Sequence, residues 1–540
     1  MSPIDNNGMR RNNAVFDKIG VENFKAFGAL QRVRLKPITL LYGKNSSGKS
    51  SFIHSLLYLK SIKSSGNFDP KDTKLLRFGG FDRFKHERLE GQIVAFDLCL
   101  NGADLVPIFS SGLKSFNIRL EVKRNGDPKL GPVCLQQILF SISDEEPFFS
   151  FRYLRKGRYK LEVDSKSKSG LRLFSETEKN LETVENSLEC VVTENYLIPD
   201  RVIAKSGTKP QGILVAKIED FLTKVSKEIS DYLDNVSYLC GNRDVADQGI
   251  LDGAVSSNDE EDSGGLYYWE QIRKDADLRE QVNTHLRLLF DKRYEIIAVD
   301  FFKSSTAAKY AENIQQDFTS ASEEIENQEN ADNDLGDISG YLDHPMKDEK
   351  VSSTNSKEEK EPEEKPFGEL VEDKLDSVSG DRIEIRILDT NSKTRIKLLP
   401  HELGFGVGQV IPIIAAACLS GRTVIVEQPE THLHPKQQAD LGEILASSLA
   451  LQEGGGEGST FIIETHSIHI LERLGKIIRE TSNKKDFKGL ILMPGEVGVY
   501  YVDAEESSSV KLRRMELRDD GKLKRKWPGE FFNEDMNDLF

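Results

Sequence analysis

Hydrophobic and polar residues follow two different spacings along this chain, and the spacing changes with position. Short alternating or continuous apolar runs, separated by Gly, Asn and Asp turns, predict β-strands. These runs occupy residues 18–27, 30–41, 92–100, 115–122, 133–142 and 148–163. The last four predict a mainly antiparallel β lobe.

Apolar residues at intervals of three and four predict helices at 49–64, 267–290 and 410–419. A further helical pattern begins near residue 177 and is clearest over 215–233. Its apolar stripe consists of Val215, Ile218, Leu222, Val225, Ile229 and Leu233. We interpret that stripe as a face packed on the core. Residues 171–310 are predicted to form an inserted helical arm.

The composition changes between residues 311 and 380, where Glu, Asp, Asn, Ser and Lys dominate. A segment of this kind buries too little apolar surface to offset the entropy lost on ordering. We therefore expect a disordered or loosely helical acidic insertion. A tether for a partner is one interpretation of it, and a plain solvated loop is the other. Structure is expected to resume with a hairpin of residues 381–388 and 394–399.

The first candidate site lies between the apolar run 38–41 and the helix predicted from residue 49. It has the pattern GxxxxGKS, in which backbone N–H groups approach phosphate oxygens and the following helix presents its positive N-terminal end. Lys49 is expected to reach the β and γ phosphates, and the Ser50 hydroxyl to ligate Mg²⁺. The residues of this predicted cradle are Gly43, Lys44, Asn45, Ser46, Ser47, Gly48, Lys49, Ser50 and Ser51. The alternative is a chance Gly/Ser/Lys turn.

A second glycine-rich turn precedes the apolar helix 410–419. Several N–H groups converge at such a turn, so it is a candidate anion site. Its candidate residues are Gly404, Gly406, Gly408 and Gln409. Taken alone, the pattern is as typical of a tight packing turn.

Two carboxylates follow the buried strand predicted at 423–426. We assign Glu427 to Mg²⁺ and Glu430 to the water that attacks the γ phosphate, as its base or orienting group. His432 and His434 come next, two residues apart. Because that spacing does not place them on one helix face, we prefer a structural loop to a metal pair.

Another buried strand, predicted at 461–463, ends close to His466. A histidine at this sheet edge can hydrogen-bond the γ phosphate and so sense which nucleotide is bound. The structural alternative is a capped helix start at Thr465 or Ser467, and both interpretations can hold together.

Charge and cysteine content narrow the class of protein. The 540 residues carry a formal net charge of -16, which argues against a uniformly basic nucleic-acid wrapper. The five cysteines form no CxxC pair, so a reducing cytoplasm fits best. No apolar run approaches the ~18 residues needed to span a bilayer, and residues 1–13 lack a signal-peptide core. We expect a soluble, cytoplasmic protein without membrane contact.

In this order, the motifs resemble the head of an ABC-type ATPase. The sequence is most similar to the OLD and RecF-like branch, whose members open with a strand carrying Asn-Phe-Lys and continue LYGxNSSGKSS. Here Asn23 to Lys25 match the first element and residues 41–51 the second. The likeness extends to residues 404–412, 427–435, 464–467 and 527–532, the last of which is similar to the closing motif of defence-associated AAA-like ATPases. The two ends match well and the middle poorly.

The resemblance implies an α/β fold, an ABC-type P-loop ATPase head with a mixed sheet, helices and an antiparallel β lobe. The predicted domains are an N-terminal ATPase lobe at 1–170, the helical arm at 171–310, the acidic insertion at 311–380 and a C-terminal ATPase lobe at 381–540. It also implies ATP and Mg²⁺ as ligands, with Asn23 and Lys25 beside the nucleotide. The expected assembly is a homodimer or higher oligomer in which one copy's phosphate loop faces another's residues 403–409 across ATP.

Within this branch, the chain is similar to the PtuA ATPases of Septu anti-phage systems, including those joined to retrons. That family is thought to restrain an HNH endonuclease, PtuB, until infection, so the resemblance implies a PtuB-like partner, and a retron reverse transcriptase with its msDNA. Relatives commonly have a serine before the signature glutamine, whereas this chain has Gly408. Because that hydroxyl would contact the γ phosphate of the facing subunit, slow hydrolysis and a held ATP-bound dimer are expected.

Nucleic-acid cleavage is expected from a partner chain. OLD nucleases and the Gabija ATPase resemble this sequence at the front but add a Toprim domain, which needs a Glu and a DxD cluster. Only 74 residues (540 - 466) follow His466, and Asp503-Ala504-Glu505 is no such cluster. An HNH-like His/Asn arrangement is also missing from the sequence.

Two other functions remain open. One is a DNA-repair ATPase of the RecF/SMC type, against which the sequence shows no long heptad coiled coil. The other is a transporter nucleotide-binding subunit, which the inserted arm and the EQPE pattern disfavour. Arg243 and Lys25 are candidates for contact with phosphate or with a base of DNA, and ordinary surface charge is the alternative.

Overall fold

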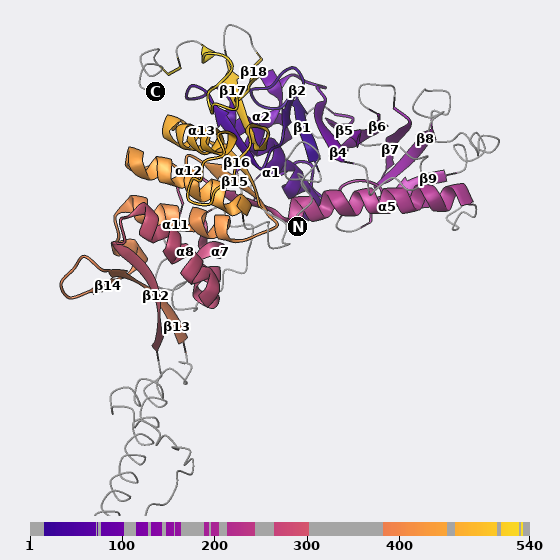
Figure 1. Cartoon of the computed structure of the whole chain (residues 1–540). Helices are drawn as coiled ribbons and strands as arrows, with labels where there is room; N and C mark the ends of the chain where they lie inside the picture. The colour runs from indigo at the N-terminus through magenta and orange to yellow at the C-terminus, as the bar shows by residue number, and fades with distance from the viewer. Residues whose placement is uncertain are drawn as a thin grey trace, which may run out of the picture. The chain divides into compact units, whose positions relative to one another are not determined.

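The computed structural model of the chain is a mixed α/β fold, which confirms the predicted fold class (Figure 1). The structure describes residues 16–71, 73, 77–101, 115–127, 131–142, 147–155, 157–163, 188–193, 196–204, 213–243, 264–301, 382–450, 459–504, 509–528 and 531–532. The predicted acidic insertion, 311–380, lies outside them. The chain divides into one unit of Met1–Ile297 with Arg386–Phe540 and a second of Ala298–Ile385, of which only strand ends are described.

A six-stranded sheet forms the centre of the first unit, in the order β11-β15-β16-β3-β17-β18. Strand β3 (Ile38–Tyr42) runs parallel to both neighbours, β16 (Thr460–Glu464) and β17 (Val497–Asp503). All five residues of β3 are buried, as expected of a continuous apolar run covered on both faces. The remaining strands are β11 (Val236–Leu239), β15 (Thr423–Glu427) and the antiparallel edge strand β18 (Lys511–Met515).

The predicted antiparallel lobe is a nine-stranded sheet in the order β10-β9-β8-β7-β6-β5-β4-β1-β2. Its strands are β1 (Phe16–Glu22), β2 (Gln31–Arg34), β4 (Val94–Asn101), β5 (Ser115–Arg124), β6 (Val133–Ser141), β7 (Phe149–Arg155), β8 (Arg158–Val163), β9 (Leu188–Val191) and β10 (Arg201–Ala204). The helical pattern expected from residue 177 is wrong over β9 and β10. These short segments are strands because β8 and β9 supply backbone partners, which local periodicity does not report.

The start of the chain holds three strands where two were expected. Strand β1 stops at Glu22 because Asn23 and Lys25 adopt left-handed backbone angles, with φ of 55° and 48°. The apolar run 30–41 is divided into β2 and β3 by Pro37, which cannot donate a ladder hydrogen bond. The turn at Asn23 and Lys25, after β1, places Lys25 against His54 of α1, the helix that follows the phosphate loop.

Helices cover the sheets. They are α1 (Lys49–Ser65), α2 (Phe81–Phe84), α5 (Ile213–Asp234), α7 (Leu266–Lys274), α8 (Ala276–Leu289), α11 (Phe405–Cys418), α12 (Pro435–Ala450) and α13 (Ile468–Ser482). Helices α12 and α13 pack on each other, while α11 packs against α7 and α8 (Figure 1). The apolar stripe predicted on α5 is buried in the core, as expected. Among the described helices, none combines the length and the apolarity needed to cross a membrane.

A small sheet completes the described elements, in the order β12-β13-β14. Its strands are β12 (Tyr294–Phe301), β13 (Arg382–Asp389) and β14 (Ile396–Leu398). Strands β13 and β14 pair antiparallel with Ile387 opposite Leu398, which confirms the predicted hairpin. A 3-10 turn at Pro400–Glu402 connects the hairpin to the glycine-rich segment, which runs into α11.

An aromatic cluster fixes α1 against the antiparallel sheet. The ring of Tyr58 in α1 lies 4.7 Å from that of Phe84 and 5.5 Å from that of Phe96, between ring centroids. Phe24, in the turn after β1, lies 5.1 Å from Phe84. All four side chains are fully buried, so the helix that begins at the phosphate loop is anchored by packing near its middle.

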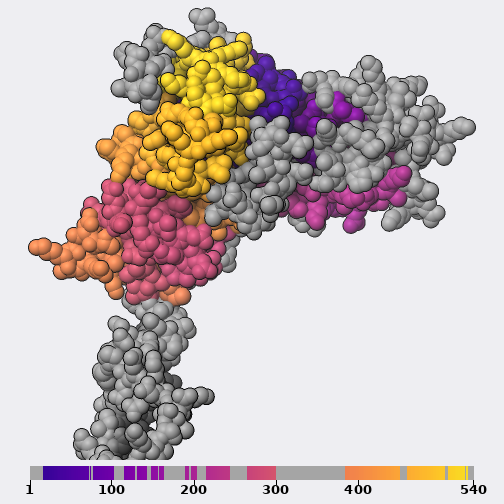
Figure 2. All heavy atoms as spheres, in the orientation of Figure 1, coloured from indigo at the N-terminus to yellow at the C-terminus, as the bar shows by residue number. Residues whose placement is uncertain are grey.

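The C-terminal segment packs on the strand that leads into the phosphate loop. The rings of Trp527 and Phe532 lie 5.0 and 6.0 Å from that of Tyr42, the last residue of β3. Phe531 lies 5.3 Å from the ring of Tyr501 in β17. The surface view shows the C-terminal residues in yellow adjoining the N-terminal ones in indigo (Figure 2). Gly529 and Glu530 of the closing motif lie outside the described residues.

Replacing Phe84 with alanine should lower the free energy of unfolding by about 3–5 kcal/mol, because it removes a fully buried ring from this cluster. Leu89→Ala is the control, since Leu89 is 53% exposed and its truncation should change stability by no more than about 0.5 kcal/mol. Urea unfolding followed by tryptophan fluorescence measures both. Equal effects of the two variants would show that the cluster does not anchor α1.

Candidate functional site

The phosphate loop connects β3 to α1 and depends on two glycines. Gly43 has a φ of 154° and Gly48 a φ of 103°, in the left-handed region that favours glycine. A Cβ at Gly43 would lie 2.7 Å from the carbonyl oxygen of Val502, and one at Gly48 would lie 2.7 Å from the Cβ of Ala26. The loop thus has the tight backbone that a phosphate cradle needs, and α1 begins at Lys49 as predicted.

Lys49 folds back over its own loop. Its Nζ donates hydrogen bonds of 3.0 Å to the carbonyl oxygens of Gly43 and Lys44, and its side chain is 3% exposed. Burial lowers the pKa of Lys49, while the carboxylate of Glu464 acts in the opposite direction. The ammonium group is therefore held at the mouth of the loop by weak neutral acceptors, which an anion would outcompete.

Glu464 is the functional residue that sequence reasoning missed. It ends β16, next to β3, and its Oε2 accepts a 2.7 Å hydrogen bond from the Ser50 hydroxyl. Its Oε1 lies 3.8 Å from Lys49 Nζ. The signal was present, because an acidic residue at the carboxyl end of a buried strand faces the loop of a neighbouring parallel strand. Only the strand order shows that this neighbour is β3.

Glu427 lies directly beside Glu464, because the two residues are register partners at the ends of β15 and β16. Burial, followed by repulsion from Glu464, raises the pKa of Glu427 to about 7. Its Oε1 is buried, has no hydrogen-bond partner in the described part of the chain, and lies 3.8 Å from His54 Nε2. Glu464 raises the pKa of this carboxyl group, whereas Tyr238, Lys25 and Arg243 act to lower it.

Lys25 reaches the site from the turn after β1. Its Nζ makes a short contact with Nδ1 of His54, which projects from α1. Burial lowers the pKa of Lys25 to about 8 and that of His54 to about 3, so the imidazole is neutral. Asn23 points elsewhere, since its amide bonds the carbonyl of Ile93 and the side chain of Gln92.

Glu430 lies on the loop after β15 and is held by residues of the loop after β16. Its two carboxylate oxygens accept 2.7 Å hydrogen bonds from the Thr465 hydroxyl and from the backbone N–H of His466. Burial raises the pKa of Glu430, while these two hydrogen bonds act to lower it. Burial, and then the charge of Lys49, lowers the pKa of His466. Its Nε2 is buried and has no hydrogen-bond partner among the described residues. The Ser467 hydroxyl caps α13 by accepting from Ile470 N–H, so the structural alternative at this position is confirmed.

The glycine-rich segment is helical, because α11 begins at Phe405 rather than at residue 410. Gly406 is required by the fold, since a Cβ there would collide with the carbonyl of His432. Gly404 has an ordinary φ of -55°, and a Cβ added to it would meet no atom within 4 Å. Gln409 is 1% exposed and bonds the Asn242 side chain and the Arg243 carbonyl, while Gly408 is buried.

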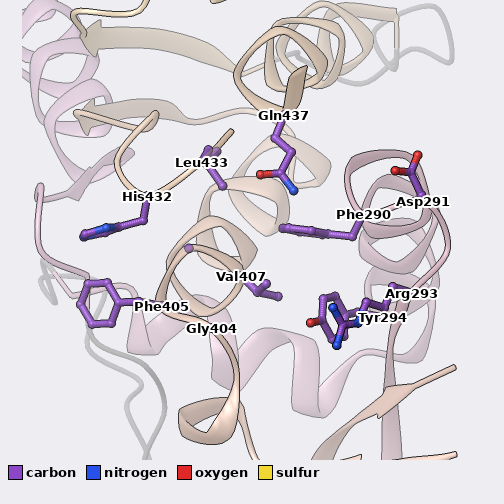
Figure 3. Close-up of a pocket in the computed structure, with 11 residues that line it drawn as sticks. Phe290, Asp291, Arg293, Tyr294, Gly404, Phe405, Val407, His432, Leu433 and Gln437 are labelled. Atoms are coloured by element: carbon purple, nitrogen blue, oxygen red, sulfur yellow. The ribbon is translucent and has the colours of Figure 1, made fainter. Parts of the chain in front are cut away.

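An open cavity of about 550 Å³ lies beside this segment (Figure 3). The rings of Phe405 and His432 meet edge to face at 4.9 Å on one side, and those of Phe290 and Tyr294 line the other. Phe405 is 51% exposed. His432 is thus a lining residue of the cavity, and its neighbour His434 is exposed.

The interpretation of Arg243 as an ordinary surface charge is wrong, because the side chain is 2% exposed. Its contact with a phosphate or a base stays a prediction. Its guanidinium donates to the carbonyl oxygens of Gln409, Cys240, Glu427 and Gln428. A lone arginine in a loop gives no sequence signal for such a role.

The site has features that fit a bound nucleotide and divalent cation. Around the loop, three buried polar atoms have no hydrogen-bond partner among the residues that the structure describes: Ser47 Oγ, Glu427 Oε1 and His466 Nε2. Ser50, Glu427 and Glu464 supply the hard oxygen ligands that Mg²⁺ prefers. The described residues therefore place Lys49, Ser50, Glu427, Glu430 and His466 at one edge of the sheet, with Glu464 among them.

Comparison with protein families gives two matches. The profile described as an AAA ATPase domain (AAA_15) matches residues 16–471. A second profile, described as a protein of unknown function (DUF3696), matches residues 492–540. No curated protein matches the chain.

Solved structures similar to this fold include heads of SMC proteins. An SMC head bound to the C-terminal winged-helix domain of ScpA is 9% identical, with a TM-score of 0.36, and the alignment covers 93% of this chain and 98% of that one. The SMC head domain from Thermotoga maritima is 10% identical, with a TM-score of 0.33 and coverage of 93% and 99%. The head from Pyrococcus furiosus, bound to the C-terminal domain of ScpA, is also 10% identical, with a TM-score of 0.33 and coverage of 93% and 96%.

Glu427→Gln should remove part of the pH dependence of stability in metal-free buffer. Folding raises the pKa of Glu427 from 4.5 to about 7, so the folded chain keeps a proton that the unfolded chain loses between these values. The free energy of unfolding therefore falls as pH rises through this window, by about 3 kcal/mol for this one group. The variant should be more stable than the parent at pH 8 and gain much less at pH 5, as measured by urea unfolding.

The exposed Glu90 provides the matched control, because Glu90→Gln changes the same functional group away from the site. Its unfolding free energy should follow that of the parent at both pH values. A Glu427→Gln variant with the parent's pH dependence would contradict the assigned environment of Glu427.

Proposed function

This chain belongs to the AAA ATPase domain family, and from that premise we propose that it binds Mg²⁺–ATP at the phosphate loop, dimerises through it and hydrolyses it slowly. The observation that carries the proposal is the meeting of Lys49, Ser50 and Glu464 with the Glu427–Glu430 loop at the carboxyl ends of β3, β15 and β16. In open α/β sheets, ligands bind at that edge.

The residues of the loop would change partners when phosphate enters. Lys49 Nζ would leave the carbonyl oxygens of Gly43 and Lys44 for phosphate oxygens, which are stronger acceptors because they are charged. Ser50, Glu427 and Glu464 would hold the cation. When bound, Mg²⁺ neutralises charge that develops on the phosphates.

Glu430 is proposed to accept the proton of the attacking water or to orient it. Its bonds to Thr465 and His466 fix the carboxylate, and burial raises its pKa toward the range useful for a base. Each carboxylate oxygen keeps a second lone pair for the water. His466 would hydrogen-bond the γ phosphate through its Nε2, which has no partner among the described residues. The backbone N–H of the same residue bonds Glu430, so the sensing group and the carboxylate lie together.

Dimerisation is supported by the contrast between two glycines of the α11 start. Gly406 is explained by the crowding of His432, whereas nothing in the described part of the single chain requires glycine at position 404. Because glycine has no side chain, a facing backbone or phosphate could approach closely at position 404. Phe405, exposed between these glycines, supplies apolar area for a facing copy.

Glu430→Gln should retain ATP binding, lose hydrolysis by about 10²-fold or more, and accumulate an ATP-dependent dimer, because the amide cannot act as a base. Malachite-green phosphate release and analytical ultracentrifugation with and without Mg²⁺–ATP measure the two effects. Lys49→Ala is the control variant and should fail to bind nucleotide, so it should neither hydrolyse nor dimerise on ATP addition. If the Glu430→Gln variant hydrolysed ATP at the parental rate, Glu430 would have no role in the hydrolysis step.

For the biological role, we propose a switch of anti-phage defence similar to the PtuA ATPases. ATP would hold the chain in a closed state that restrains a PtuB-like HNH nuclease, and infection would release it. The proposal is supported by the sequence likeness at residues 404–412, 427–435 and 464–467, and by Gly408, where relatives commonly have the serine that would contact the γ phosphate. A repair ATPase acting on DNA directly is the competing role.

Affinity purification of the tagged chain from its native host, with and without ATP, should recover an HNH nuclease or a reverse transcriptase with its msDNA. Mass spectrometry and sequencing of the nucleic acid identify what co-purifies. Lys49→Ala controls for nucleotide-independent contacts. Recovery of generic DNA with repair factors alone would support the repair role and contradict the defence role.

A further inference from the structure

Arg243 is a buried cation that binds only main-chain carbonyls among the described residues. Its Nε lies 2.8 Å from the carbonyl oxygen of Gln409, and its Nη1 lies 2.9 and 3.0 Å from those of Cys240 and Glu427. Its Nη2 is 3.4 Å from the carbonyl of Gln428. Burial lowers its pKa to about 10, so it stays charged at neutral pH. A charge buried without a carboxylate ligand is retained in a fold only where its hydrogen bonds are well satisfied.

The bond to Gln409 is reciprocal. Arg243 donates from its side chain to the Gln409 carbonyl, and Gln409 Nε2 donates to the Arg243 carbonyl at 3.4 Å. Gln409 also reaches the side chain of Asn242 at 3.3 Å. Because each residue holds the other's backbone, α11 cannot shift along its axis without moving the segment after β11.

The other end of the guanidinium holds the loop that carries the two carboxylates. Glu427 ends β15, and Gln428 follows with a left-handed φ of 45°. The N–H of Gln428 donates to the Glu464 carbonyl at 2.7 Å, and its own carbonyl accepts from Thr431. The position of Gln428 therefore sets the path of the chain from Glu427 to Glu430.

We propose that Arg243 is a positioning residue that couples α11 to the Glu427–Glu430 loop, so that contact of α11 with a facing copy adjusts the hydrolytic carboxylates of its own site. This rests on the proposed ATPase function. The guanidinium suits the role because one planar group bonds three segments at once, which the single ammonium of lysine cannot reproduce with the same geometry. Among the described residues its guanidinium bonds main-chain carbonyls, which is the arrangement expected of a positioning residue.

The test compares Arg243→Lys with Arg124→Lys. Arg124 is the matched control, since its side chain is also largely buried but pairs with Asp69 and Asp82 in the antiparallel lobe. Arg243→Lys should lower kcat by about tenfold or more while the dissociation constant for ATP stays within about twofold, because the phosphate loop does not contact Arg243. The control should leave both unchanged. Calorimetric titration with Mg²⁺–ATP and steady-state phosphate release give the two numbers.

A double-mutant cycle with Gln409→Ala separates coupling from general loosening. If Arg243 and Gln409 act as one link, the double variant should lose no more kcat than the worse single variant. Hydrogen exchange supplies a readout independent of turnover. In the parent, Mg²⁺–ATP should protect peptides of 405–418 and 427–433 together, and in Arg243→Lys it should protect 405–418 without 427–433.

The outcomes distinguish this inference from the proposed function. Parental kcat and joint protection in Arg243→Lys, with an active parent, would overturn the coupling and leave the ATPase intact. Equal loss of ATP affinity and kcat would show a merely structural role and also overturn it. A parent that neither binds nor hydrolyses ATP would overturn the proposed function instead.

Discussion

The register of three parallel strands is the constraint on which the site depends. Glu427 is paired with Glu464, and Glu464 with Leu41, so the ends of β15, β16 and β3 lie level at one edge. The phosphate loop starts two residues beyond Leu41. A slip of one residue would turn every side chain of the slipped strand to the opposite face and separate Glu464 from Ser50. The continuous burial of β3, β15 and β16 holds this register.

That alignment brings the carboxylates of Glu427 and Glu464 together in a poorly solvated place. The charges of the neighbouring side chains act on this pair. Repulsion and burial keep Glu427 prone to protonation, while Lys49, Lys25 and Arg243 contribute positive charge from three different segments. The neutral His54 separates Lys25 from Glu427. Several buried polar atoms here have no hydrogen-bond partner within the described ranges, as is common where a fold gives up stability for function.

Local chemistry was predictable from the sequence, and long-range partnerships were not. The GxxxxGKS loop, the two acidic residues at and just after the end of β15, and the cap of α13 at Ser467 were predictable because each depends on adjacent residues. Glu464 was passed over because its partner Ser50 becomes a neighbour only through strand order. The burial of Arg243 and Gln409 was not predictable, because nothing local distinguishes a buried guanidinium or amide from an exposed one. The helical pattern over β9 and β10 misleads because the pairing of β9 with β8, and of β10 with β9, overrides local periodicity.

The position of β3 in the central sheet also orders events during synthesis of the chain. This early strand lies between β16 and β17, and its last residue, Tyr42, is covered by Trp527 and Phe532. On the ribosome, the phosphate loop is made long before either neighbouring strand exists to support it. A growing chain therefore completes the sheet around this loop only after β17 has been synthesised.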